Sequence, residues 1–98
     1  PGVLVPAHGV YATRVWFEDG ESRPAVTNIG VRPTVNDGDR VTVEGYILDF
    51  QGDLYGQTVR MEFYKYLRGE RKFSSLEELR AEVMRNARQT REYFDARA

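Results

Sequence analysis

Hydrophobic and polar side chains alternate through much of the first two thirds of the chain. In QTVRMEFYKYL (57–67), Val59, Met61 and Phe63 alternate with charged or polar residues. This period of two is typical of a strand with one solvent-facing side. Stretches rich in β-branched and aromatic residues also favour strands. Together these patterns predict four strands, at 9–17, 23–30, 41–50 and 57–67.

Turn signals separate the predicted strands. Asp19-Gly20 is typical of a hairpin turn between the first two. VRPTVNDGDR (31–40) is interpreted as a loop, with Pro33 in it and a turn at 36–38. NIGVRPT (28–34) is then either an ordinary turn or a loop that presents backbone N–H groups to an anion.

From Ser74 onward the hydrophobic period becomes that of a helix. Ser74 with Glu77, or Ser75 with Glu78, has the spacing of a capping box. We expect one amphipathic helix over about 75–95. Its core face comprises Leu76, Leu79, Val83, Ala87, Thr90, Tyr93 and Phe94. Its solvated outer face comprises Glu77, Glu78, Arg80, Glu82, Arg85, Arg88 and Arg91.

The order of elements predicts a mainly β fold. Four strands with short links and one terminal helix imply a small antiparallel barrel or sheet against which the helix packs. The 98 residues are enough for one domain, 1–98, with one modest core. The sequence contains no internal repeat that would suggest another architecture.

Composition excludes several kinds of function. The formal net charge of −1 provides no basic field for nucleic acid or for an anionic membrane. There is no cysteine, and His8 is the only histidine, so thiolate and histidine-cluster metal sites are excluded. Because no stretch is apolar enough for a membrane span and no leader opens the chain, we expect a cytoplasmic protein.

Glu44 is the first candidate for chemistry. It lies in VEGYILDF (43–50), where alternation places it on one strand face with Thr42, Tyr46 and Leu48. Glu44 is therefore either an ordinary carboxylate on the solvent side or a general base on a concave face.

Two further segments could contact a ligand. Tyr55, in the turn DLYG (53–56), either packs on the rim of the fold or stacks on a planar ligand. Arg68, Arg71 and Phe73 lie just before the helix, where they suit either a planar or anionic ligand or a solvated link.

Four segments in order resemble the riboflavin kinase module. They are GVYATRV, VTNIGVRPT, VEGYILDFQGDLYG and YLRGERKFSSLEEL, and the similarity extends from residue 9 to about 90. In bacteria this module is the C-terminal part of a bifunctional riboflavin kinase/FAD synthetase. The resemblance implies a six-stranded Greek-key barrel with a C-terminal helix. It also implies transfer of a phosphoryl group from Mg-ATP to riboflavin, which gives FMN.

The resemblance assigns roles to particular residues. Glu44 would be the catalytic base. Tyr55, Ile47 and Asp49 would lie on the nucleotide side, and the flavin side would be formed by Arg68, Arg71 and Phe73.

The sequence departs from the family pattern in three places. No Pro-Thr-Ala-Asn motif precedes Gly9, and the chain does not begin with Met. We therefore expect an N-terminally truncated module that lacks its first strand, with the Mg²⁺ ligands and an adenylyltransferase domain upstream. A homo-oligomer would cover the edges that a missing strand exposes. In addition, Tyr46 occupies a common His position and Asn86 a common Asp position.

Two alternatives to an active kinase stay open at this point. One is a flavin- or nucleotide-binding remnant without catalysis. The other is an unrelated small β-barrel that binds nucleic acid or protein. The near-neutral charge argues against nucleic acid.

Overall fold

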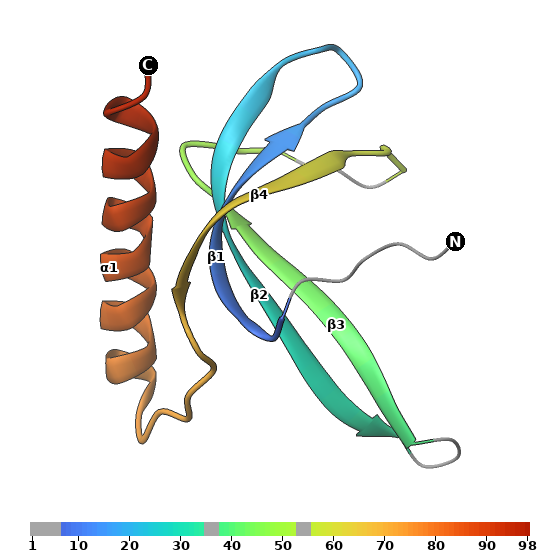
Figure 1. Cartoon of the computed structure of the whole chain (residues 1–98), viewed down its shortest axis with the longest axis vertical. Helices are drawn as coiled ribbons and strands as arrows, with labels where there is room; N and C mark the ends of the chain where they lie inside the picture. Colours follow the sequence, from blue (N-terminus) through green and yellow to red (C-terminus); the bar gives the residue numbers. More distant parts are fainter. Residues whose placement is uncertain (1–6, 35–37, 53–55) are drawn as a thin grey trace.

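The computed structural model describes residues 7–34, 38–52 and 56–98. A twisted sheet and one helix form two layers (Figure 1). The elements in chain order are β1 (Gly9–Trp16), β2 (Ser22–Thr34), β3 (Gly38–Ile47), β4 (Arg60–Arg68) and α1 (Leu76–Asp95).

The sheet has the strand order of a Greek key. All its pairs are antiparallel, and the order is β3-β2-β1-β4. Three successive strands are neighbours, and the fourth returns to lie beside the first. The prediction of a mainly β, antiparallel Greek-key fold with one C-terminal helix is confirmed. The described residues form four of the six strands that the resemblance implies, and they contain no ladder between β3 and β4.

The β1–β2 hairpin closes where the sequence predicts it. Phe17 N donates to Glu21 O at 2.8 Å, and Gly20 N donates to Phe17 O at 3.1 Å. Gly20 has φ +91°, which a residue without Cβ adopts readily. The Asp19 side chain accepts a hydrogen bond from Glu21 N at 2.9 Å and so holds the turn.

The prediction of a loop is wrong for residues 31–34 and 38–40, which are strand, while 35–37, which hold most of the predicted turn at 36–38, lie outside the described residues. β2 continues to Thr34 and pairs with β3, with Pro33 opposite Asp39. Its ladder with β1 ends at the Gly9–Ile29 pair. Pro33 therefore lies where β2 has only one neighbouring strand, which tolerates a residue without an N–H donor. Because residues 28–34 are part of β2, they do not form the anion-binding loop or the ordinary turn that the sequence suggested.

Buried apolar side chains lie on both faces of the sheet: Val15 and Ile29 on one face, and a cluster against α1 on the other. Val10, Val26 and Leu48 pack with Ala87 of the helix. The opposite sheet face buries Thr13 and Thr27, whose hydroxyl groups are 2.7 Å apart. Toward the edges this second face is open. Val43 is 52% exposed although it is apolar, because nothing in the described chain covers that end of β3.

The helix begins with a side-chain cap. Ser75 is the N-cap, and its hydroxyl accepts a hydrogen bond from Glu78 N at 3.1 Å. The Glu78 carboxylate bonds back to the hydroxyl of Ser74 at 2.8 Å. The N–H group of Glu78, one of the N-terminal donors that the helix itself leaves unpaired, is thus satisfied locally.

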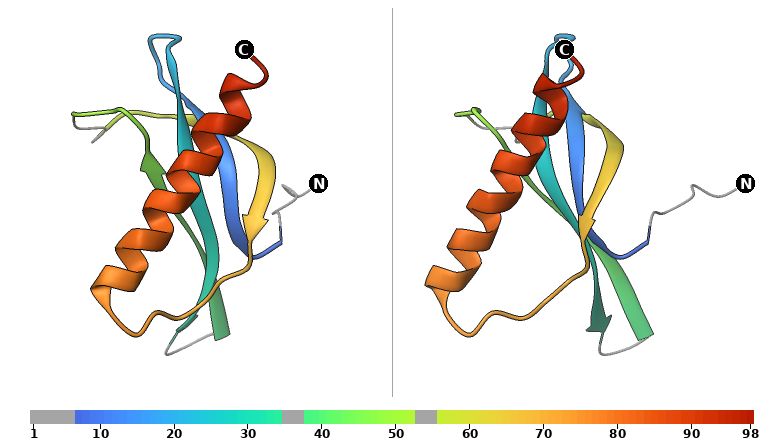
Figure 2. Two further views of the ribbon diagram at one scale, coloured as in Figure 1. Left: turned by 90° about the vertical axis from the view of Figure 1, so that its left-hand side faces the viewer. Right: turned by 60° about the vertical axis from the view of Figure 1, so that its left-hand side comes forward.

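The predicted core face of the helix is only partly right. α1 crosses the sheet at an angle and diverges from it toward its N-terminal end (Figure 2). Leu76 is consequently 76% exposed and Leu79 is 39% exposed, whereas Ala87 and Thr90 are buried. Glu82, predicted on the solvated face, is buried at 8% exposure. No described helix is long and apolar enough to cross a membrane.

Candidate active site

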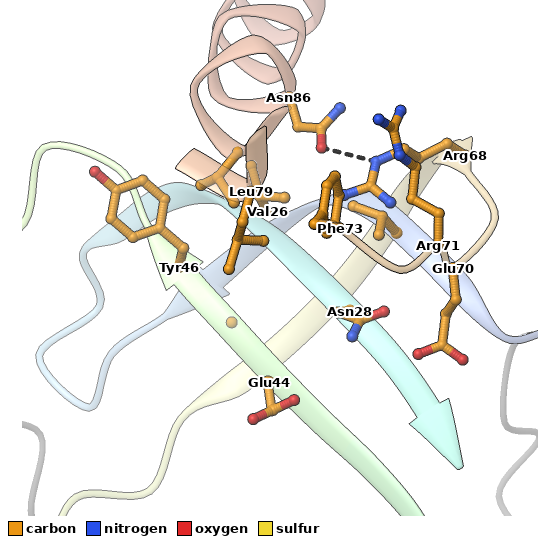
Figure 3. A pocket seen from close by; sticks show the side chains of 13 residues that line it. Val26, Asn28, Glu44, Tyr46, Arg68, Glu70, Arg71, Phe73, Leu79 and Asn86 are labelled. Atoms are coloured by element: carbon orange, nitrogen blue, oxygen red, sulfur yellow. Dashed lines mark hydrogen bonds between the residues drawn. The ribbon is translucent and has the colours of Figure 1, made fainter. Parts of the chain in front are cut away.

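A pocket of about 460 Å³ lies between the sheet and the N-terminal half of α1. Its floor comes from β1, β2 and β3, and its walls come from the helix and the link after β4 (Figure 3). The divergence of α1 from the sheet opens this space. The same divergence exposes Leu79, which forms part of the apolar wall with Val83 and Val26.

Four of the predicted site residues line this one pocket. Glu44 comes from β3, while Arg68, Arg71 and Phe73 come from the end of β4 and the link that follows. About a quarter of the chain separates Glu44 from Arg68 along the sequence. Antiparallel pairing of β2 with β3 and of β1 with β4 brings them to the same side of the sheet.

Two other predicted residues, Ile47 and Asp49, are not among those that line the pocket. Ile47 pairs with Ala25 of β2. Asp49 follows β3 and forms an ion pair with Arg91 of the helix at 2.9 Å. The hydrogen bond and charge of Arg91 lower the pKa of Asp49 below its ordinary value. Tyr55 lies outside the described residues.

Glu44 is an exposed residue on the floor of the pocket, opposite Asn28 of β2. The alternation predicted for its strand is correct, because Tyr46 also lines the pocket and Leu48 enters the core on the same side. Asn28 Oδ1 is buried and has no hydrogen-bond partner within the described part of the chain. Asn28 is the first residue of the segment NIGVRPT (28–34), and the sequence alone assigns it no role.

Glu70 is a second carboxylate at the pocket that sequence reasoning did not single out. A Cβ built on Gly30 would lie 2.6 Å from Glu70 Oε2, so the carboxylate rests directly against β2. The sequence feature that could have pointed to Glu70 is its position between Arg68 and Arg71, two residues predicted to bind the ligand. The periodicity could not show that this link folds back over the sheet.

Phe73 is flanked by two guanidinium groups. Arg71 Cζ lies 4.7 Å from the ring centroid and Arg68 Cζ lies 5.7 Å from it. Cation–π attraction holds such groups together at these distances. The pocket therefore combines an aromatic ring, an apolar helix wall and positive charge on one side with two carboxylates on the sheet side.

The described residues contain no group of three or more His, Cys, Asp or Glu side chains placed to hold a metal ion. The aromatic ring, apolar wall and charged groups of the pocket suit a planar, partly apolar organic molecule that has polar groups at one end. A hydroxyl group at that end would meet a carboxylate.

Comparison with known proteins decides the family. The family model described as riboflavin kinase (flavokinase) matches residues 1–94. The chain belongs to the riboflavin kinase family. This membership confirms the relationship that the four sequence segments indicate.

Relatives of this riboflavin kinase family member are longer proteins. The bifunctional riboflavin kinase/FMN adenylyltransferase of Pseudomonas fluorescens is 46% identical over 79 residues, which are 81% of this chain and 25% of the relative. The protein of the same name from Escherichia coli strain K12 is 42% identical over 89 residues, 91% of this chain and 28% of the relative. The chain thus spans about a quarter of the length of these relatives.

One solved structure is also similar. It is described as a macrolide-efflux protein from Streptococcus pneumoniae, and it aligns with a TM-score of 0.83 and 30% sequence identity. The alignment covers 90% of this chain and 28% of the other. It supports the fold, again as one part of a longer chain.

Proposed function

We propose that this chain transfers the γ-phosphoryl group of ATP to the 5′-hydroxyl of riboflavin, giving FMN and ADP. One observation carries the proposal. In a member of the riboflavin kinase family, Glu44 and the Arg68–Phe73 link line the same pocket.

Substrate orientation follows from the two sides of the pocket. The flat isoalloxazine ring suits the space beside Phe73 and the apolar wall of α1. The guanidinium groups of Arg68 and Arg71 can donate hydrogen bonds to its carbonyl oxygens. The ribityl chain would then extend over β3, toward Glu44.

Glu44 is the proposed general base. Its carboxylate accepts the proton of the 5′-hydroxyl as that oxygen forms a bond to the γ-phosphorus. The bond from the γ-phosphorus to the bridging oxygen breaks, and its electron pair leaves with ADP. Holding the hydroxyl beside the carboxylate is the main contribution of the protein in such a step.

The nucleotide side of the site stays a proposal drawn from the family resemblance. Its candidates are Tyr55, Ile47 and Asp49, of which Asp49 forms an ion pair with Arg91. Mg-ATP is the proposed phosphoryl donor. Because the described residues supply no cluster of metal ligands, we assign no step in this pocket to the metal.

A second domain in the full-length protein is also proposed. Since the relatives are named for two activities and the chain spans about a quarter of their length, we propose that a full-length protein pairs this module with an FMN adenylyltransferase domain. Such a protein would act in the cytoplasm, where its nucleotide and flavin substrates occur.

The proposal is tested by incubating the chain with riboflavin, ATP and Mg²⁺ and separating the flavins by chromatography. We expect a peak of FMN that grows with time and requires ATP. Riboflavin that binds but is never converted would instead favour the non-catalytic remnant. Failure of the chain to bind either substrate would contradict both the kinase and the non-catalytic binding remnant.

A further inference from the structure

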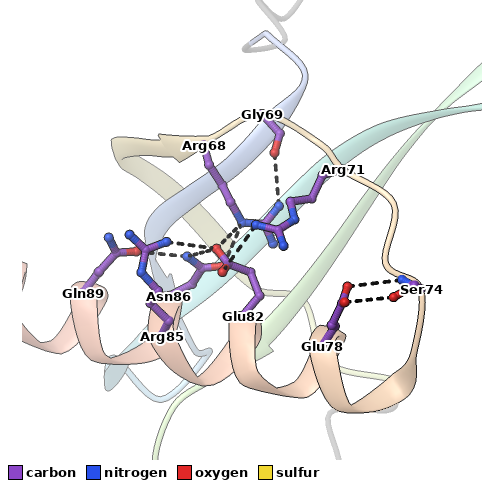
Figure 4. Close-up of polar contacts among 9 residues, drawn as sticks. All are labelled: Arg68, Gly69, Arg71, Ser74, Glu78, Glu82, Arg85, Asn86 and Gln89. Atoms are coloured by element: carbon purple, nitrogen blue, oxygen red, sulfur yellow. Dashed lines mark hydrogen bonds and ion pairs between the residues drawn. The ribbon is translucent and has the colours of Figure 1, made fainter.

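Glu82 is a buried carboxylate that forms ion pairs with three arginines. Its oxygens lie 3.0 Å from Arg68 Nε, 3.3 Å from Arg85 Nη1 and 3.7 Å from Arg71 Nη1 (Figure 4). Asn86 joins the group, since its Oδ1 accepts from Arg68 Nε at 3.0 Å. The side chain of Glu82 is 9% exposed and that of Arg68 is 18% exposed, so this pair is largely shielded from water.

Glu82 is absent from the lining of the pocket, whereas two of its partners, Arg68 and Arg71, line it. The third partner, Arg85, lies one turn along the helix and does not. The carboxylate therefore contacts the pocket through these two arginines and through Asn86, a lining residue whose Nδ2 donates to Glu82 Oε2 at 3.4 Å. Those two guanidinium groups also flank Phe73, so their position fixes the ring as well.

Within the described chain, the ion-pair partner of Arg68 is Glu82, whereas Arg71 also lies within electrostatic reach of the Glu78 carboxylate. Arg68 bonds otherwise to the neutral Asn86 and to the carbonyl of Gly69. Loss of the Glu82 charge would leave a half-buried guanidinium without its counter-ion, which is costly. Arg68 would then turn toward solvent, and the pocket would lose the side chain that forms part of its lining.

We propose that Glu82 is a positioning residue of the riboflavin kinase site: it holds Arg68 and Arg71 where they receive the flavin ring. The inference rests on the proposed function, and it assigns Glu82 to substrate binding rather than to the phosphoryl transfer itself. Loss of the charge should raise KM for riboflavin and leave kcat nearly unchanged.

The test compares Glu82→Gln with Glu77→Gln, which removes the same charge from an exposed position of the same helix. We expect Glu82→Gln to weaken riboflavin binding, measured by flavin fluorescence, by about tenfold, the scale of one hydrogen bond to a charged group. KM should rise in parallel and kcat should stay within about twofold. Glu77→Gln should match the wild type.

A second substitution separates positioning from general damage. Asn86 Oδ1 already bonds to Arg68, so Asn86→Asp places a carboxylate on the same guanidinium from the next turn of the helix. We expect the double variant Glu82→Gln/Asn86→Asp to recover most of the lost affinity. Unchanged binding in Glu82→Gln, or weakened binding that Asn86→Asp does not restore, would overturn the proposal.

The wild-type protein supplies a test that needs no substrate. The Nε–H of Arg68 should give a resolved, slowly exchanging signal in a ¹⁵N NMR spectrum, because both of its acceptors lie at 3.0 Å. Exchange as fast as that of an exposed arginine would overturn the inference, even if a variant fails to fold. A chain with the protected signal but no FMN formation would contradict only the proposed function.

Discussion

Gly9 opens β1 in a conformation that other residues rarely adopt. Its φ is +147°, and a Cβ at this position would lie 2.5 Å from Tyr66 Cε1 and 2.8 Å from Arg68 O. The second contact is with backbone of β4, which cannot turn away as a side chain can. Gly9 thus permits the close approach of β1 to the end of β4, where the arginine link begins.

We predict that Gly9→Ala lowers the free energy of unfolding by about 3 kcal/mol, since backbone strain alone costs about 1–3 kcal/mol and a clash is added. Gly20→Ala is the matched control, because Gly20 also has a positive φ but has open space around it. Urea unfolding should show the larger loss for Gly9→Ala. Equal losses would mean that the contact with β4 contributes nothing.

The sequence identified some pocket residues and missed others for physical reasons. Glu44, Arg68 and Phe73 stand in recognisable segments, and their side chains reach the pocket directly. Glu82 looked solvated because helical periodicity treats every charged position on the outer face alike. Its burial depends on the path of the link from Arg68 to Phe73, which lacks any regular period.

At the scale of elements, the start of α1 depends on one hydroxyl. Ser75 accepts from Glu78 N and so satisfies a donor that the helix itself cannot. We predict that Ser75→Ala lowers the free energy of unfolding by about 1 kcal/mol, the usual loss at an N-cap. Urea unfolding with Ser75→Asp as the conservative control should show near wild-type stability for the control. A neutral Ser75→Ala would contradict the cap.

The β1–β4 contact makes stability depend on pH. Glu62 accepts hydrogen bonds from Trp16 Nε1 at 2.7 Å and from the Tyr64 hydroxyl at 3.0 Å. These bonds favour the ionised form and lower the pKa of Glu62 in the folded protein. The stabilisation is therefore complete above the ordinary carboxyl pKa, about 4, and is lost as pH falls through the lowered folded value.

We predict that Glu62→Gln reduces stability at pH 7 and that this deficit shrinks as pH falls below about 4. The measurement is urea unfolding of both proteins at several pH values between neutral and strongly acidic. A deficit that is the same at every pH would show that the charge of Glu62 is irrelevant to this contact.

Strand lengths were harder to predict than strand existence. The four strands occur in the expected order. However, the pairing of β2 with β1 ends at Ile29, and β2 continues for five more residues to Thr34. Pro33 is a turn signal in isolation. It becomes a strand residue because β3 is available as a partner on one side only, and local sequence does not carry that information.

At the scale of the molecule, the described residues form an open Greek-key sheet with a helix across one face. The alternation of β3 correctly grouped Glu44 with Tyr46 and Leu48 on one face, but the sequence did not show that α1 lies over that face, and the pocket is opened by the angle between α1 and the sheet (Figure 2). That angle depends on packing of Ala87 and its neighbours, so the hydrophobic pattern could not give it. Association of copies through the exposed strand edges stays a prediction.

The central claim is that this pocket phosphorylates riboflavin with Glu44 as base. The most direct measurement is the rate of FMN formation by the wild type, by Glu44→Gln and by the surface control Glu77→Gln, each shown to be folded. We predict FMN from the wild type and the control, and a rate about 10²–10⁴-fold lower from Glu44→Gln, the usual range for a general base. FMN formed equally fast by Glu44→Gln would contradict the role of Glu44, and no FMN from the wild type would contradict the activity.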